Sequence, residues 1–125
     1  MNKLWVAIIV LAVLLGTGIG SAYFMKTVHE ELANRLEQAS ALAQSDWEEA
    51  KALAGSARAK WEKYEHLIAA LADHEPLEQL NGMFAELEVC QQQEDKACFA
   101  VVCVRIASLA EMLGESHSPC WWNLL

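Results

Sequence analysis

The sequence predicts an all-α protein in which one N-terminal transmembrane helix continues into a small antiparallel bundle of about four helices, the stalk included. An uncharged apolar run between Leu4 and Met25 indicates the membrane helix. The chain has two prolines and six glycines in 125 residues, and three of the glycines lie in that run, so helix is expected elsewhere. Apolar residues then recur at three- and four-residue steps, the period of amphipathic helices.

The uncharged run is long enough to act as a membrane anchor. Its 22 residues can cross the roughly 30 Å hydrocarbon core of a bilayer as one helix. Trp5 and Tyr23 lie near its two ends, where aromatic rings favour the headgroup layer. We therefore expect the chain to contact the membrane from Leu4 to Met25.

The same segment also fits a cleaved signal peptide. Residues 4–15 have the length of a signal-peptide core, and Gly20, Ser21 and Ala22 are small residues suited to a cleavage site. Apolar character continues beyond them and a helical period follows at residues 26–43, so we expect the anchor to be retained. A bundle secreted after signal cleavage is the alternative.

Charge limits the partners and bears on the location. All 17 acidic residues follow the anchor with eight of the nine lysines and arginines, which gives that part of the chain a net charge of −9. Such a surface repels nucleic acid, so no nucleic-acid partner is expected. The N-terminus resembles an export signal, and we expect a single-pass protein of the cytoplasmic membrane with an extracytoplasmic C-terminal domain.

Periodicity and helix-end signals divide the rest of the chain. Ser45 with Glu48 has the spacing of a capping box, Pro76 suits a first helical turn, Asp95 follows a turn, and Gly114 is an expected helix stop. The predicted segments are an anchor at 1–25, a helical stalk at 26–44, a bundle domain at 45–115 with helices at 46–72, 76–92 and 96–113, and a tail at 116–125.

Apolar stripes on these helices define the predicted core. Trp47 and Trp61 are fourteen residues apart, so they project from the same side of one helix with small residues between them. The predicted bundle core comprises Trp47, Trp61, Tyr64, Ile68, Leu71, Leu80, Phe84, Leu87, Ile106 and Leu109.

Two surfaces are candidates for association. Residues 99–104 are apolar on every side, so this part of the last helix is either central in the bundle or covered by a partner. Val101, Cys103 and Val104 are the candidate partner-facing residues. Gly16 and Gly20 have the spacing that lets two membrane helices approach closely, which makes a homodimer a further candidate.

The cysteines and histidines offer little chemistry. Cys90 and Cys98 flank the turn near Glu94 symmetrically, so they are candidates for a disulfide in an exported domain, and buried free thiols are the alternative. His66 and His74 are eight residues apart and form at most a loose metal site, with His74 better suited to closing the preceding helix. Motifs for nucleophilic catalysis, phosphate binding and dinucleotide binding are absent, so neither catalysis nor a cofactor is expected.

An ordered set of short motifs resembles the family called domain of unknown function 4363. A short N-terminal anchor is followed by residues 46–50 (DWEEA), 61–63 (WEK), 73–75 (DHE) with Leu77 and Leu80, Leu87, 94–97 (EDKA) and a terminal 123–125 (NLL). The resemblance implies a membrane-anchored helical domain of a Gram-positive bacterium, a firmicute, with no activity assigned. The apolar residues at 98–104 depart from the charged pattern of the family.

These observations favour a non-enzymatic interaction or scaffold module held at the membrane by its anchor, with an unknown protein partner. A small-ligand or metal-sensing bundle that signals through the stalk is the rival interpretation.

Overall fold

The computed structural model describes residues 2–71 and 74–116, and their side chains except at positions 68, 70, 71, 74 and 114–116. Every regular element in these ranges is an α-helix, which confirms the all-α class. The four helices are α1 (Asn2–Leu42), α2 (Trp47–Leu71), α3 (His74–Gln92) and α4 (Lys96–Ser116).

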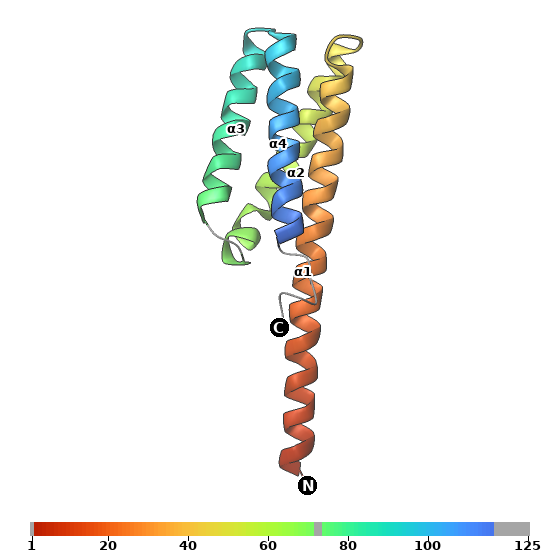
Figure 1. The fold of residues 1–125 in the computed structure, drawn as a ribbon, viewed down its shortest axis with the longest axis vertical. Helices are drawn as coiled ribbons and strands as arrows, with labels where there is room; N and C mark the ends of the chain where they lie inside the picture. The colour runs from red at the N-terminus through yellow and green to blue at the C-terminus, as the bar shows by residue number, and fades with distance from the viewer. Residues whose placement is uncertain (1, 72–73, 117–125) are drawn as a thin grey trace.

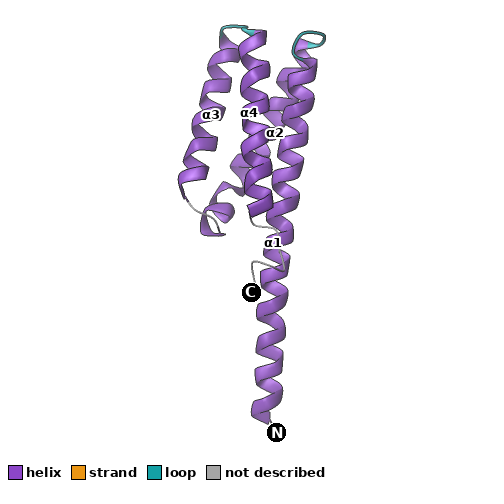
Figure 2. Ribbon diagram, in the orientation of Figure 1, coloured by secondary structure: helices purple, strands orange, loops and turns teal. Residues whose placement is uncertain are grey.

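The helices alternate in direction and form an antiparallel bundle (Figure 1). α1 packs against α2 and α4, and α4 also packs against α3, whereas α2 and α3 share a smaller contact. Of the described helices, only α1 projects beyond the bundle, with its N-terminal half, and short loops join α1 to α2 and α3 to α4 at the opposite end (Figure 2). The stalk predicted at residues 26–44 is therefore the bundle half of α1, joined without a break to the apolar half.

The bundle half of α1 is helical because its apolar stripe has partners on two sides. Every residue from 2 to 20 is exposed, Ser21 and Ala22 are half-buried, and Met25 is the first buried residue. From there the period of three and four places one side of the helix in the core. The buried residues of α1 are Met25, Val28, His29, Leu32, Ala33, Leu36 and Ala39.

Side-chain caps begin the second and fourth helices. Asp95 Oδ1 accepts a hydrogen bond from the backbone N–H of Cys98 at 3.0 Å, as expected for a cap after the turn. Before α2, Asp46 Oδ1 accepts from the N–H of Glu49 at 3.2 Å. The expected cap at Ser45 is thus wrong by one residue, because Asp46 also supplies the carbonyl that accepts from the N–H of Ala50 at 2.9 Å.

Two helix ends differ from the prediction. α3 starts at His74, two residues before the predicted start, and Pro76 lies in its first turn, where proline is tolerated. The expected role of the His74 side chain in closing the preceding helix lies outside the described residues. α4 continues through Gly114 to Ser116. Glycine permits a helix stop without requiring one, and inside a helix it costs only about 1 kcal/mol relative to alanine.

Trp61 lies at the centre of the core, where α1, α2 and α3 meet. Its side chain is 1% exposed, and its ring lies edge-on to the ring of His29, with centroids 6.3 Å apart. The indole N–H donates to Asn81 Oδ1 at 2.7 Å, which satisfies the polar atom of an otherwise apolar group. Three small residues that precede Trp61 on α2 are also buried and allow the helices to approach closely: Ala50, Ala54 and Ala57.

The other predicted core residues divide by depth. Leu80, Phe84, Leu87 and Ile106 are buried. Trp47, Tyr64 and Leu109 are partly buried and pack against the edge of the same core. The side chains of Ile68 and Leu71 lie outside the described part of the chain.

Ion pairs support the two seams around α2. Between α1 and α2, Lys60 pairs with Glu31, and this hydrogen bond holds the pKa of the Glu31 carboxyl below its ordinary value. Between α2 and α3, Arg58 pairs with Glu88 at 2.9 Å. These pairs lie at half-exposed positions, so they align the helices and stabilise the bundle less than the core does.

Trp61→Ala should be strongly destabilising, because it removes a fully buried indole at the meeting point of three helices. We expect the free energy of unfolding to fall by about 3–5 kcal/mol. Urea unfolding of the full chain in detergent, followed by circular dichroism, measures the change. Val89→Ala, at a side chain that is 50% exposed on α3, is the control and should be nearly neutral. Equal losses in the two variants would contradict a core centred on Trp61.

Candidate functional site

Part of the outer face of α4 is apolar although none of the described helices covers it. Phe99, Val102 and Ile106 are buried, whereas Val101 is 59% exposed and Val104 is 48% exposed. A helix turns by about 100° per residue, so residues 101 and 104 share a face that points away from the core. The all-round apolar segment at 99–104 is therefore covered on one side only.

The expectation for Cys103 was wrong, because this residue does not share the exposed face. Cys103 is fully buried, next to Val102 in the core. Burial raises the pKa of its thiol to about 12, so the group is protonated and unreactive at neutral pH. Of the three candidate partner-facing residues, Val101 and Val104 remain accessible.

A shallow hollow lies beside these two valines, between α4 and α1. It has a volume of about 290 Å³ and is lined by Ser40, Ala100, Val101, Val104 and Arg105. The hydroxyl of Ser40 donates to the carbonyl of Ala100 at 2.9 Å and so ties the two helices together along its floor. We call this feature the α1–α4 groove.

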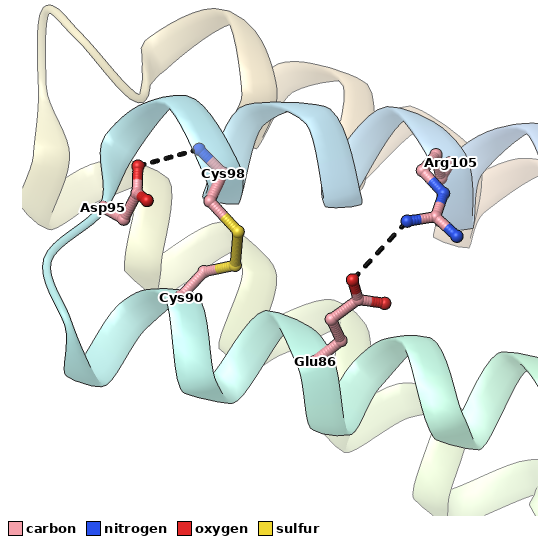
Figure 3. Close-up of a disulfide and its surroundings, with 5 residues drawn as sticks. All are labelled: Glu86, Cys90, Asp95, Cys98 and Arg105. Atoms are coloured by element: carbon pink, nitrogen blue, oxygen red, sulfur yellow. Dashed lines mark hydrogen bonds and ion pairs between the residues drawn. A yellow bond between two sulfur atoms is a disulfide. The ribbon is translucent and has the colours of Figure 1, made fainter.

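One charged residue, Arg105, lines the α1–α4 groove. The guanidinium of Arg105 lies on its rim and pairs with Glu86 of α3 at 3.5 Å (Figure 3). Toward the C-terminal end of α4, a hydrogen bond with Glu37 of α1 raises the pKa of the Glu111 carboxyl above its ordinary value. The groove thus combines an apolar floor with a cation at one side, which suits an apolar side chain next to a carboxylate.

A disulfide fixes the position of α4 beside α3. Cys90, near the end of α3, is bonded to Cys98 in the first turn of α4, with the two Cα atoms 5.8 Å apart (Figure 3). The intervening turn contains Glu94 in the left-handed region, with φ of 53°. Val101 and Val104 lie three and six residues after Cys98 on the same helix. The disulfide therefore also fixes their position along the bundle axis. Cys120 lies outside the described residues.

Of the two histidines considered as metal ligands, only His66 has a described side chain. His66 is exposed on α2, and the side chain of His74 lies outside the described residues. Among the side chains that the structure describes, no three metal-ligating groups lie close enough to hold an ion.

His29 is a buried polar residue that the sequence analysis did not single out. It lies in the α1 stripe, and its Nδ1 is 2.6 Å from the carbonyl oxygen of Met25. Its place four residues after Met25 and three before Leu32 is the signal that could have located it in the core.

The family model for domain of unknown function 4363 (DUF4363) matches residues 19–124 of the chain. This chain is a member of the DUF4363 family. The match begins two residues before the point where α1 of this DUF4363 protein becomes partly buried, so the family model covers the helices of the bundle. No curated protein matches the chain, and no solved structure matches it.

Loss of the disulfide should destabilise the protein, because the bond restricts the unfolded chain. For a loop of this length the chain-entropy relation gives about 2–3 kcal/mol. We expect Cys98→Ser to lower the free energy of unfolding by that amount, measured by urea unfolding without reductant. Dithiothreitol should lower the stability of the wild type similarly and leave the variant unchanged. An unchanged wild type in dithiothreitol would contradict the assignment.

Proposed function

We propose that this DUF4363 protein is a single-pass membrane protein whose bundle lies on the outer face of the cytoplasmic membrane and binds a protein partner through the α1–α4 groove. The observation that carries the proposal is the pair of exposed valines, Val101 and Val104, beside a hollow on an otherwise acidic bundle. The function is non-enzymatic, as in a scaffold or docking module.

The chemistry of the groove supports a protein ligand. Covering the exposed parts of two valines is favourable by about 25 cal/mol per Å² of apolar area. Arg105 adds a charged group whose present partner, Glu86, is itself half-exposed and can be exchanged. The complementary ligand is a segment with an apolar side chain and a neighbouring carboxylate. The groove lies away from His66, so the metal- or ligand-sensing alternative gains no support from it.

The location is supported by α1 and by the disulfide. α1 contains a long apolar stretch near the N-terminus that no other helix covers. Disulfides persist in oxidising compartments and are rare in the cytosol. The bond between Cys90 and Cys98 therefore favours an exported bundle, consistent with the Gram-positive origin that the family resemblance implies.

Retention of the anchor is tested on the protein made in cells. We expect alkaline carbonate to leave it in the membrane, with an intact mass of 13.9 kDa, and protease added to protoplasts to digest the bundle. Cleavage after Ala22 would leave every buried residue of the bundle in place, so the cleaved alternative predicts a folded, carbonate-extractable protein starting at Tyr23. That outcome would overturn the anchor.

Partner binding is tested with a photo-crosslinking residue introduced at Val101 in intact cells. We expect a discrete adduct from position 101 and none from Val89, which is 50% exposed on α3 and serves as the matched site. A second change, Val104→Glu, should reduce the adduct at least tenfold, because it places a charge in the apolar floor. Adducts of equal yield from positions 101 and 89, or no adduct from 101, would contradict binding at the groove.

A further inference from the structure

The free part of α1 is as long as a membrane is thick. Residues 2–20 are exposed on every side, and the bundle covers the helix from Ser21 onward. At about 1.5 Å per residue these 19 residues measure about 28 Å, close to the hydrocarbon thickness of a bilayer. Nothing but continuous helix lies between this stretch and Met25, which is 2% exposed in the bundle core.

One end of the bundle lies at the level where the free part of α1, residues 2–20, ends. The antiparallel contacts between α1 and α2 continue toward this end. Arg35 bonds Ser56, and Glu31, four residues earlier on α1, pairs with Lys60, four residues later on α2.

Nearer the N-terminus of α1, the ring of Phe24 contacts the ring of Tyr64, with centroids 5.3 Å apart. Leu67 follows Tyr64 by three residues on α2, so it lies about 4.5 Å closer to the N-terminal end of the bundle half of α1. It is therefore level with the outer end of the uncharged run of α1.

The side chains at this level suit a lipid surface. Leu67 is 52% exposed although it is apolar. Lys63 lies over the ring of Tyr64, with Nζ 5.4 Å from the centroid, and its charge can reach lipid phosphates while its methylenes cover the aromatic ring. The two carboxylates nearest Lys63 in the sequence have partners, since Glu65 accepts from Asn81 at 2.8 Å and Glu62 accepts from Arg58 at 3.2 Å.

We propose that the base of the bundle, formed by Phe24, Lys63, Tyr64 and Leu67, is a lipid-binding surface that rests in the headgroup layer of the bilayer spanned by its own anchor. The proposal rests on the anchor proposed above. Leu67 enters the boundary between headgroups and acyl chains, and Lys63 contacts phosphate. The bundle then stands upright on the membrane, because α1 has no hinge between the two.

The upright position sets the height of the α1–α4 groove. Ser40 is 15 residues beyond Met25 on the same helix, which places the groove about 22 Å above the base of the bundle. A partner must therefore present its apolar segment at that height.

Depth-dependent quenching tests the contact. The full chain with Cys120→Ser carries a nitrobenzoxadiazole probe on Leu67→Cys, and a matched protein carries it on Val101→Cys, which has similar exposure on α4. Cys103 is buried and does not compete for the probe. Both proteins are reconstituted in phosphatidylcholine and phosphatidylglycerol vesicles that contain lipids with a nitroxide at acyl position 5. Circular dichroism and flotation of the vesicles verify folding and insertion.

We expect the probe at position 67 to be quenched at least twofold more than the probe at position 101. Equal quenching at the two positions in protein that floats with the vesicles would overturn the contact and leave the anchor intact. Protein that folds and does not float would overturn the anchor, and the contact with it.

Discussion

The continuity of α1 is the constraint on which the rest of the structure depends. One helix supplies the apolar stretch and, on its second half, one side of the bundle core. α2 and α4 both pack on that half, and α3 reaches the bundle mainly through α4. The bundle is therefore assembled on the helix that carries the long apolar stretch, and the position of every other helix is defined relative to it.

Local signals were readable from the sequence because they depend on neighbouring residues. The helix class, the turn at Glu94 and the Asp95 cap follow from composition and spacing along a short stretch of chain. The cap of α2 was misplaced by one residue, since Ser45 and Asp46 are both good caps and the choice is made by backbone geometry. Gly114 was misassigned for a related reason, because glycine allows either a stop or a further turn.

The candidate site was less predictable, because it depends on which face of each helix is covered. An all-apolar segment gives no periodicity, so the sequence could not separate Cys103 in the core from Val101 and Val104 outside it. Contacts such as that between Ser40 and Ala100 join positions 60 residues apart and leave no local pattern. The sequence did not indicate that His29 is buried, because a polar residue within an apolar stripe is expected at the edge of the stripe.

The order of contacts along the chain bears on how the molecule is made. The α3–α4 hairpin, closed by the bond between Cys90 and Cys98, joins segments close in sequence. The packing of α4 against α1, in contrast, joins the last helix of the chain to the first. Until α4 has been synthesised, the side of α1 that packs against α4 is therefore uncovered, and α2 covers only part of the helix. Truncated chains that lack α4 leave the apolar side of α1 uncovered, and quality-control proteases can recognise such a surface.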